Sequence, residues 1–295
     1  MDKCYESWCN LMGEKKISII TAAYNAEKTI EQTISSVVNQ DYDNLEYIIV
    51  DGASTDGTVQ IIEKYASYGI RWISEPDQGL YDALNKGVCM STGDYIQIIG
   101  ADDALTSPTV ISTVAAQFDS SVDIFAGDLW CVDESTAKQI CFTNEKVRDR
   151  AHYRGGAMIP HAAMFVRREL LLRYPFDTSY RIVSDYKFFL QCYYDQDVHI
   201  KFGEEKIAFF SYSGISSNPQ ACWEEDNRLY QELGLPFQSP NYIHTSRIKY
   251  VMWKLITSMG LFRIGQMAWR YINIRMRWKK HVCVNKICRW CGRVE

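Results

Sequence analysis

Short runs rich in β-branched residues alternate with segments of helical hydrophobic spacing in the first half of this chain. The runs are typical of strands and occupy residues 16–21, 45–50, 70–74, 94–99 and 122–126. Between the first two runs, apolar residues recur at the spacing of a helix that packs one face on a sheet. Strands joined through helices pair in parallel, so the pattern predicts an α/β fold with a mostly parallel central sheet flanked by helices.

The pattern changes after residue 130. The elements predicted there are a hairpin over 131–142, a strand over 158–167, a helix over 184–194, a strand over 207–212 and a helix over 221–233. A chain of 295 residues is long enough for one large α/β domain, or for one domain with a tail.

Composition excludes several classes of protein. Apolar residues make up 47% of the chain and charged residues 23%, as is ordinary for a globular protein. No run of 18 apolar residues marks a membrane span, and the N-terminus, MDKCYESWCN, lacks the apolar core of an export signal. The ten cysteines are scattered, which is typical of reduced thiols in the cytosol. We therefore expect a cytoplasmic protein.

Charge is divided unevenly along the chain. Residues 241–295 hold 12 of the 32 Lys and Arg residues but one of the 36 acids. The acidic body argues against nucleic acid as a partner, because binding nucleic acid depends on positive charge. The tail interleaves aromatic with basic residues and predicts a basic amphipathic helical segment on an anionic membrane surface. The alternative is a basic helix that packs on the acidic body.

Polar residues follow three of the predicted strands. Asp51, the 75–77 turn and Asp102-Asp103 stand at carboxyl ends of strands, where α/β sheets bind their ligands. Two adjacent carboxylates repel each other unless a cation neutralises them, and Mg²⁺ or Mn²⁺ prefers such oxygen ligands. The sequence therefore indicates a metal and diphosphate site at this edge, with an ordinary Asp-rich turn as the alternative.

The loops after the first two strands offer room for a nucleotide. Small residues surround Tyr24, whose ring could pack on a base or ribose, and Asp51 could accept a hydrogen bond from a pyrimidine N3–H. Gly52 lets the backbone approach closely, whereas Asp56 is expected only to cap a helix. Neither GxGxxG nor GxxxxGK[ST] occurs, which weakens dehydrogenase and ATPase interpretations.

The chain resembles glycosyltransferase family 2 in four stretches that occur in order: ISIITAAYNAEKTIEQTISSVVNQ, EYIIVDGASTDGT, SEPDQGLYDALNKGV and GDYIQIIGADD. The resemblance covers roughly residues 16–215 and is narrower with the bacterial polysaccharide branch that includes colanic-acid-type enzymes. It implies a GT-A fold, a nucleotide-sugar donor, a divalent metal and inversion at the anomeric carbon.

The resemblance assigns roles to single positions. Asp51 matches the residue that reads the base, Asp102 the acid near the ribose or metal, and Asp103 the direct ligand of Mn²⁺ or Mg²⁺. Gly100-Ala101 stand where the family often has a pair such as Asn-Ser, which weakens the expectation of side-chain contacts to the sugar there. The expected donor-binding residues are Thr21, Ala23, Tyr24, Asn25, Asp51, Gly52, Asp77, Tyr81, Asp82, Asn85, Lys86 and Asp102.

An inverting transfer also needs a general base that takes the proton of the acceptor hydroxyl. Asp185, at the predicted start of a helix, resembles the catalytic Asp of the family, although Ser184 stands where the family often has an acid. Helix capping is the structural alternative for Asp185, and Asp177 and Asp128 are weaker candidates for the base.

Two residues are expected on the acceptor side. His161 matches a family position there, and Arg167, beside Arg168, could meet an anionic acceptor such as a lipid pyrophosphate. A packed structural histidine and a solvated basic turn are the alternatives.

These assignments predict a hexosyl- or N-acetylhexosaminyltransferase that moves one sugar, from a UDP-sugar, onto a lipid-linked or polysaccharide-repeat acceptor. Capsule and lipopolysaccharide synthesis at the inner face of the cytoplasmic membrane are such settings. The expected organisation is an irregular lead-in at 1–15, a nucleotide-sugar-binding half at 16–130, an acceptor-binding half at 131–240 and the basic amphipathic helical tail at 241–295.

A catalytically inactive nucleotide-sugar-binding scaffold is the main alternative. A nucleotidyltransferase would need a Gly-rich basic loop after the first strand, and a processive synthase a QxxRW motif; neither occurs. Cys288-x-x-Cys291, with Cys283 nearby, lacks the second Cys pair of many zinc sites, so zinc binding is not expected.

Overall fold

The computed structural model describes residues 14–149, 153, 158–211, 219–235, 279–291 and 293–294. The predicted lead-in up to residue 13 and most of the predicted basic tail, residues 241–278, lie outside the described residues.

Four parallel strands form the first half of the central sheet, in the order β3-β2-β1-β4. They are β1 (Ile17–Ala23), β2 (Leu45–Asp51), β3 (Arg71–Ser74) and β4 (Tyr95–Ile98). The strands β1, β2 and β4 are buried nearly throughout, as expected for a parallel sheet covered on both faces. In register, Ala23 lies opposite Asp51 and Asp51 opposite Ser74, so the residues that follow these strands meet at one edge.

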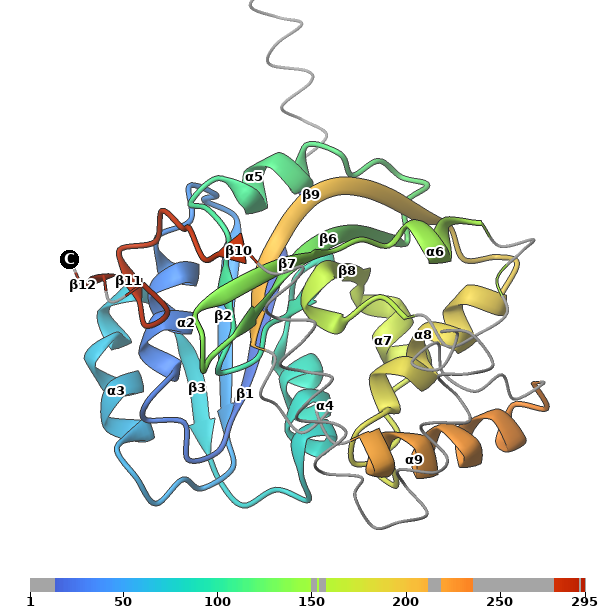
Figure 1. Cartoon of the computed structure of the whole chain (residues 1–295), viewed down its shortest axis with the longest axis horizontal. Coiled ribbons are helices and arrows are strands. Elements are labelled where there is room, and N and C mark those ends of the chain that lie inside the picture. Colours follow the sequence, from blue (N-terminus) through green and yellow to red (C-terminus); the bar gives the residue numbers. More distant parts are fainter. Residues whose placement is uncertain are drawn as a thin grey trace, which may run out of the picture.

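Helices cover both faces of this parallel half. Ile19 points to the face that α2 (Ile30–Val38) and α3 (Thr58–Lys64) cover. Ile20 points to the opposite face, which α4 (Leu80–Met90) covers. The two-residue repeat of a strand causes this alternation. Figure 1 shows α2 and α3 on one side of the blue strands and α4 on the other.

The second half of the sheet is mixed. It contains β5 (Ala104–Leu105), β6 (Ile124–Asp133), β7 (Lys138–Phe142), β8 (Met164–Arg167) and β9 (Ile200–Ser211). The strand β8 lies antiparallel between β4 and β6, β7 pairs antiparallel with β6, and β9 pairs parallel with β6. The long strands β6 and β9 arch over the elements below them (Figure 1). The predicted α/β class with a mostly parallel sheet and flanking helices is confirmed.

The remaining helices are short except for two. They are η1 (Ala66–Tyr68), α5 (Val110–Ala115), α6 (Glu145–Arg148), η2 (His161–Ala163), α7 (Arg168–Arg173), α8 (Ser184–Tyr194) and α9 (Pro219–Glu232). The strand predicted over 158–167 begins only at Met164, because the 3₁₀ turn η2 precedes it. This turn follows Pro160, whose fixed φ of −58° suits the start of a turn.

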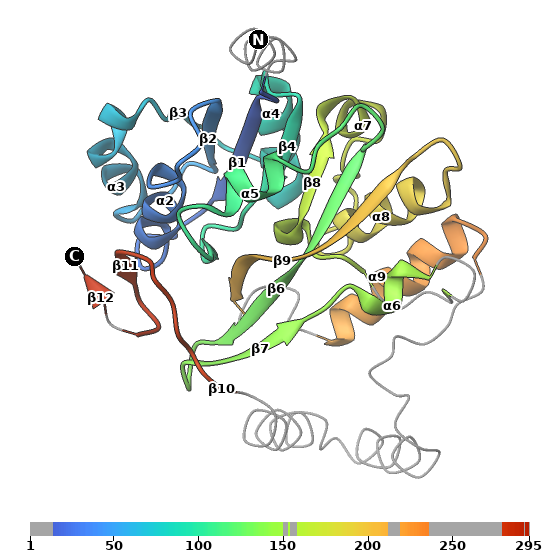
Figure 2. The ribbon, with the colours of Figure 1, turned by 90° about the horizontal axis from the view of Figure 1, so that it is seen from above.

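The end of the chain differs from the predicted helical tail. The described residues there form β10 (Lys279–Lys280), β11 (Ile287–Cys288) and β12 (Arg293–Val294). The strand β10 extends the sheet by pairing with β7, whose outer edge would otherwise leave backbone groups without partners. Figure 2 shows this segment, in red, running from the beginning of β7 toward α2.

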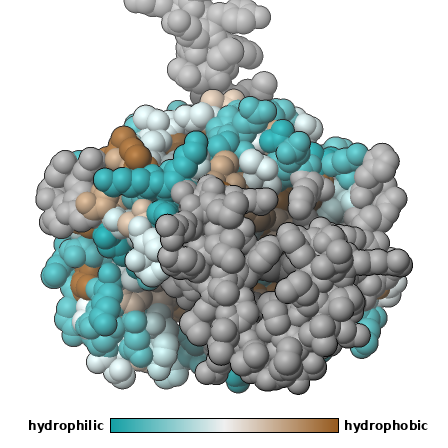
Figure 3. All heavy atoms as spheres, in the orientation of Figure 1, coloured by the Kyte–Doolittle hydropathy of each residue, from teal (hydrophilic) through white to brown (hydrophobic). Residues whose placement is uncertain are grey.

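The surface of the described residues is mixed in character. The visible face in Figure 3 is largely hydrophilic where it is coloured, with single apolar side chains between, as is normal for a globular protein. Within the described part of the chain, none of the helices combines the length and the apolar character needed to cross a membrane.

Candidate active site

The carboxyl ends of β1, β2 and β3 bring Asp51 into a fixed position. Its side chain is fully buried. It accepts hydrogen bonds from the Ser54 N–H (2.9 Å), the Ser54 hydroxyl (2.5 Å) and the Ser74 hydroxyl (2.7 Å). Three of the about four lone-pair sites of this carboxylate are therefore occupied, and they hold the side chain in place.

Gly52 allows two other predicted site residues to crowd together. A Cβ atom at Gly52 would lie 2.4 Å from Asp77 Oδ2 and 3.4 Å from the Tyr24 ring. Asp77 in turn accepts the N–H of Gly79, at the start of α4, at 2.8 Å. The ring of Tyr24 is 66% exposed, so it offers a flat apolar face at this edge. The missing side chain of Gly52 is therefore a requirement of the site.

Asn25 shapes the loop after β1. Its φ of 48° lies in the left-handed region, which Asn tolerates better than most residues. Its side-chain oxygen accepts the Thr55 N–H at 2.9 Å, and its own N–H donates to the Ser54 hydroxyl at 2.8 Å. Asn25 thereby joins the loops after β1 and β2, which together flank Asp51.

Two predicted donor-binding residues point elsewhere. Thr21 is fully buried, and its hydroxyl lies 3.1 Å from the Tyr47 hydroxyl inside the core. Asn85 bonds both backbone groups of Phe176, donating at 2.8 Å to the carbonyl and accepting at 3.0 Å from the N–H. Both side chains therefore have structural roles. Ala23 is also buried, and its carbonyl accepts the Gly52 N–H at 2.8 Å.

The first turns of α4 carry a charged network. Lys86 forms ion pairs with Glu75 (2.9 Å) and Asp82 (3.3 Å). Asp82 also accepts the N–H of Gln78 at 3.1 Å, at the beginning of the helix. The position of this network next to the Asp77 turn keeps Lys86 at the edge where the diphosphate was predicted.

Asp102 and Asp103 form a turn after β4. Asp103 is 1% exposed and accepts the N–H groups of Ser211 (2.9 Å) and Gly100 (3.2 Å). Burial, and then the charge of Asp102, raises the pKa of Asp103 to about 7. Burial also raises the pKa of Asp102, against the opposing charge of Arg289. Two carboxylates in this position fit a hard divalent cation, which would offset their charge.

Gly100 explains the departure from the usual family pattern before this turn. A Cβ atom there would lie 2.9 Å from both Asp102 Oδ1 and Asp103 Oδ2. Because both carboxylates fold back over Gly100, a larger residue would push at least one of them away.

Asp185 lies in the first turn of α8, where it meets elements from both halves of the chain. Its Oδ1 lies 3.1 Å from the hydroxyl of Tyr81, on the donor-side helix α4, and accepts the N–H of Tyr186 at 2.9 Å. Its Oδ2 lies 3.1 Å from Nδ1 of His161. The Tyr81 hydroxyl has one hydrogen to donate, and the Ile182 carbonyl, at 2.6 Å, is the nearer of its two acceptors.

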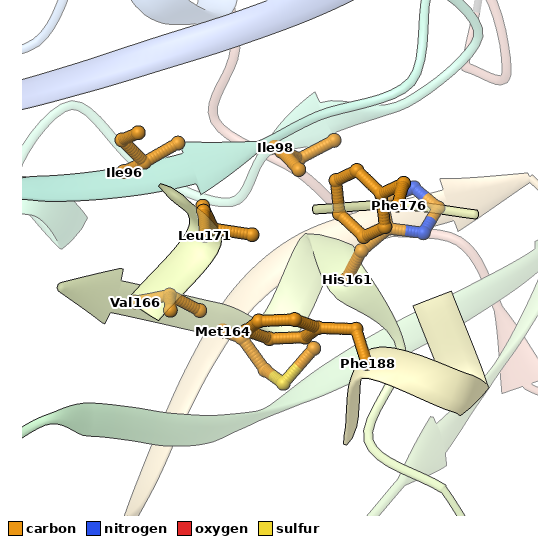
Figure 4. Close-up of a pocket in the computed structure, with 8 residues that line it drawn as sticks. All are labelled: Ile96, Ile98, His161, Met164, Val166, Leu171, Phe176 and Phe188. Carbon is orange, nitrogen blue, oxygen red and sulfur yellow. The ribbon is translucent and has the colours of Figure 1, made fainter. Parts of the chain in front are cut away.

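His161 contacts Asp185 and also lies within the electrostatic influence of Asp102 and Asp103. Burial lowers the pKa of His161, but the hydrogen bond and charge of Asp185, with the charges of Asp103 and Asp102, outweigh burial and raise it. His161 is also the one polar residue among those lining a small pocket that is otherwise apolar (Figure 4). In these apolar surroundings, the attraction between a protonated His161 and the nearby carboxylates is stronger than it would be in water.

Two acids of α9 also lie in this region, although no motif predicts a role for either. Glu225 accepts the N–H groups of Arg181 (2.8 Å), Ile182 (2.9 Å) and Val183 (3.1 Å), immediately before α8. Burial, and then the charges of Asp185 and Glu225, raises the pKa of Asp226 to about 7. Adjacent acids in a helix are common, so the local sequence contains no signal for these contacts.

Arg167 does not join the site. Because β8 runs antiparallel to β4, Arg167 lies opposite Tyr95, at the other end of the sheet from Asp102. There its guanidinium pairs with Asp123 at 2.9 Å and donates to the Val122 carbonyl at 2.9 Å. The predicted acceptor-side role of Arg167 is therefore not supported by its position.

The weaker candidates for the base are already paired with lysines. Asp177 accepts from Lys187 at 2.7 Å; burial opposes ionisation, but hydrogen bonds from Lys187 and Ser179 lower the pKa of Asp177 to about 2. Asp128 is buried and pairs with Lys206 at 2.8 Å. Of the three candidates, Asp185 is the one that contacts α4, through Tyr81.

Comparison with known proteins agrees with this geometry. The family model described as Glycosyl transferase family 2 matches residues 18–174, more than half of the chain. A PGL/p-HBAD biosynthesis glycosyltransferase of Mycobacterium tuberculosis is 28% identical over 221 residues, which is 70% of this chain and 81% of the relative. An uncharacterized glycosyltransferase of Haemophilus influenzae is 28% identical over 206 residues, which is 68% of this chain and 80% of the relative.

Solved structures show the same fold. S. aureus TarS 1-349 in complex with UDP has a TM-score of 0.59 and 20% identity, covering 76% of this chain and 67% of its own. The mannosyltransferase PcManGT of Pyrobaculum calidifontis, with GDP-Man and Mn²⁺, has a TM-score of 0.58 and 19% identity over 77% of this chain and 66% of its own. The match of the family model over more than half of the chain shows that the chain is a glycosyltransferase and belongs to glycosyl transferase family 2.

Proposed function

We propose that this protein is an inverting, metal-dependent glycosyltransferase that moves one sugar from a nucleotide-diphosphate sugar, with UDP as the nucleotide, onto an acceptor hydroxyl. The observation that carries the proposal is the contact between Asp185 and Tyr81, 3.1 Å apart. It joins the carboxylate in the second half of the chain to the helix that borders the donor edge in the first half.

The donor is placed at the edge formed by β1, β2 and β3. Asp51, which hydrogen bonds from Ser54 and Ser74 hold in place, is the proposed acceptor for a pyrimidine N3–H. Tyr24 offers its exposed ring to the base or ribose, and Asp77 lies against Gly52 beside it. Structural neighbours of this fold that contain UDP or GDP-Man support a nucleotide-sugar donor.

Asp103, assisted by Asp102, is the proposed ligand of Mn²⁺ or Mg²⁺. Their carboxylate oxygens match the preference of both ions. Burial raises the pKa of both carboxyl groups, so a bound cation would favour their ionised forms. When bound, such a cation offsets the negative charge that develops on the leaving diphosphate. Two neighbours of this fold contain Mn²⁺ in their complexes.

Asp185 is the proposed general base. It takes the proton of the acceptor hydroxyl while that oxygen attacks the anomeric carbon on the side opposite the diphosphate. His161 and the Tyr186 N–H hold the two carboxylate oxygens in a fixed orientation. The hydroxyl of Tyr81, on α4, lies against the same carboxylate. Fixing the base in this way reduces the reorganisation that the reaction requires.

The acceptor is proposed to be lipid-linked or a polysaccharide repeat, in cell-surface glycan synthesis at the inner face of the cytoplasmic membrane. Two observations support this: the basic, aromatic composition of residues 241–295, and relatives whose names place them in PGL/p-HBAD biosynthesis. Replacing the Lys and Arg residues of 247–277 by Gln should reduce co-sedimentation with anionic vesicles and leave binding to neutral vesicles unchanged. Equal co-sedimentation of both proteins would remove the membrane surface from the proposal.

A panel of nucleotide sugars tests the reaction. The protein is incubated with each donor, with a detergent extract of bacterial lipids as acceptor source, and with Mn²⁺, Mg²⁺ or a chelator; released nucleotide is measured. We expect one nucleotide to be favoured and the chelator to stop its release. The alternative, an inactive scaffold, predicts that a donor binds in calorimetry but that nucleotide release never exceeds the rate of the Asp185→Asn variant.

A further inference from the structure

Four potential metal ligands converge near the end of the chain. They come from the spacing His281-x-Cys283-x₄-Cys288-x₂-Cys291, in the segment between β10 and β12. One ligand atom from each of the four side chains lies within 4.8 Å of the other three. The sequence shows a single Cys-x-x-Cys pair, and the fold supplies the other two ligands by turning the chain back at β11.

Two separations between the ligand atoms are close to those of a tetrahedral site. His281 Nε2 lies 3.3 Å from Cys288 Sγ, and Cys283 Sγ lies 3.6 Å from Cys291 Sγ. Tetrahedral zinc, with Zn–S of about 2.3 Å and Zn–N of about 2.0–2.1 Å, keeps its ligand atoms about 3.4–3.8 Å apart. A disulfide would require the sulfur atoms at about 2.05 Å, and no disulfide joins cysteines within the described residues.

A second residue orients the histidine. Nδ1 of His281 lies 2.7 Å from Oε1 of Gln139, on β7. An amide oxygen only accepts, so Nδ1 carries the hydrogen and the lone pair of Nε2 is left facing the thiols. This arrangement, in which an outer partner fixes the tautomer and ring orientation of the ligating histidine, is a usual feature of protein zinc sites.

We propose that His281, Cys283, Cys288 and Cys291 bind one Zn²⁺ ion in a structural site. Three thiolates and one imidazole are a ligand set that favours zinc over the hard cations that bind carboxylates. Because four protein ligands complete the coordination, the ion has no open position for a substrate. Its role is to hold the chain together.

The zinc site would fasten the end of the chain beside the Asp102-Asp103 turn. Buried Cys288 and Trp290 pack against Phe209 of β9. Arg289 lies between these two residues in the sequence. Its guanidinium donates hydrogen bonds to the Asp102 carbonyl at 2.7 Å and to the Glu134 carboxylate at 2.6 Å. The segment is too short to bury much apolar surface alone, and small units of this kind commonly need a metal to stay folded.

Metal analysis of the untagged or Strep-tagged full-length protein tests the proposal. We expect about one zinc per chain after purification, and tetrahedral cobalt bands with thiolate-to-cobalt charge transfer after exchange into Co²⁺. The Cys291→Ser variant changes an exposed ligand, so folding is expected to survive while its zinc is lost to a chelator at least tenfold more readily. The Cys89→Ser variant, an exposed cysteine of α4, is the matched control and should keep its zinc.

Two more variants sharpen the result. Gln139→Ala should weaken zinc binding by about 10- to 100-fold, as loss of an outer partner of a ligating histidine does. Asp103→Asn should retain zinc, since it removes only the ligand expected for the catalytic cation. Measuring bound zinc needs no sugar donor, so the result tests the zinc site independently of the proposed transfer reaction.

The proposal is overturned by wild-type protein that carries no zinc after growth with added zinc. It is equally overturned if the Cys283→Ser, Cys291→Ser double variant holds zinc as firmly as the wild type. An intact mass two hydrogens below the calculated value, with a tryptic peptide pair linking Cys283 to Cys291, would instead assign these residues to a disulfide.

Discussion

His161 Nδ1 and Asp185 Oδ2 lie 3.1 Å apart, so a 3₁₀ turn before β8 and the first turn of α8 meet at one ion pair. The same imidazole feels the charges of Asp103 and Asp102, which raise its pKa together with Asp185. The pKa of His161 is therefore sensitive to both the proposed base and the proposed metal ligands.

The Asp185→Asn variant tests the base directly. Asparagine keeps the shape of the side chain but cannot take a proton, so we expect kcat to fall by about 10²- to 10⁴-fold, the range of general-base contributions. The Kd for the nucleotide, measured by calorimetry, should change less than threefold. Weakened nucleotide binding with unchanged turnover would remove Asp185 from the role of base.

The pKa of His161 tests the pair by a route independent of turnover. In the wild type, NMR titration of the His161 ring should give a pKa above the ordinary value of about 6.5, and Asp185→Asn should lower it. The resonance is identified by its absence from His161→Gln. A pKa that is the same in wild type and Asp185→Asn would show that the two side chains do not interact in solution.

The same shift predicts how stability depends on pH. Because folding raises the pKa of His161, the protonated imidazole contributes its full stabilisation below pH about 6.5, and that contribution is lost as the pH rises through the folded-state value. The difference in Tm between wild type and His161→Gln should therefore be larger at pH 6 than at pH 9.

Much of the fold could be predicted from local patterns. The parallel strands β1, β2 and β4 are near-continuous apolar runs between helices of clear spacing, and such runs have few other ways to be buried. The strand predicted from residue 158 begins only at Met164, because Pro160 leads into the 3₁₀ turn η2 that precedes β8.

The candidate site could be predicted less completely, because side-chain direction depends on packing. Asp51 and Asp185 lie where their motifs indicated, but Thr21 faces the core and Arg167 lies at the opposite end of the sheet. The ligand set around Cys288 also depends on a chain reversal that spacing alone does not reveal.

Gly52→Ala and Gly87→Ala form a matched pair that separates function from stability. The new Cβ of Gly52→Ala would lie 2.4 Å from Asp77 Oδ2, at the end of a side chain that can rotate away. We expect weaker nucleotide binding and a small change in Tm. The new Cβ of Gly87→Ala would lie 2.5 Å from Ile20 in the core, so we expect a loss of about 1–3 kcal/mol from overpacking, with nucleotide binding unchanged in the folded fraction.

These opposite outcomes are read by calorimetry with UDP and by thermal unfolding of the same preparations. Normal nucleotide affinity in Gly52→Ala would mean that Asp77 and Tyr24 need not lie close to Gly52 to bind the donor.

Glu225→Ala tests whether α9 holds the proposed base in place. The Glu225 carboxylate accepts the three N–H groups that precede α8, and removing it costs about 1–2 kcal/mol, as the loss of a helix cap does. Because the segment that it holds leads directly into Asp185, we expect kcat to fall. The Kd for the nucleotide, whose proposed site lies at the carboxyl ends of β1, β2 and β3, should be retained. Gln231→Ala, an exposed position on the same helix, is the control and should change neither. A variant that loses stability but keeps its full kcat at 10 °C, where it remains folded, would show that Asp185 keeps its position without α9.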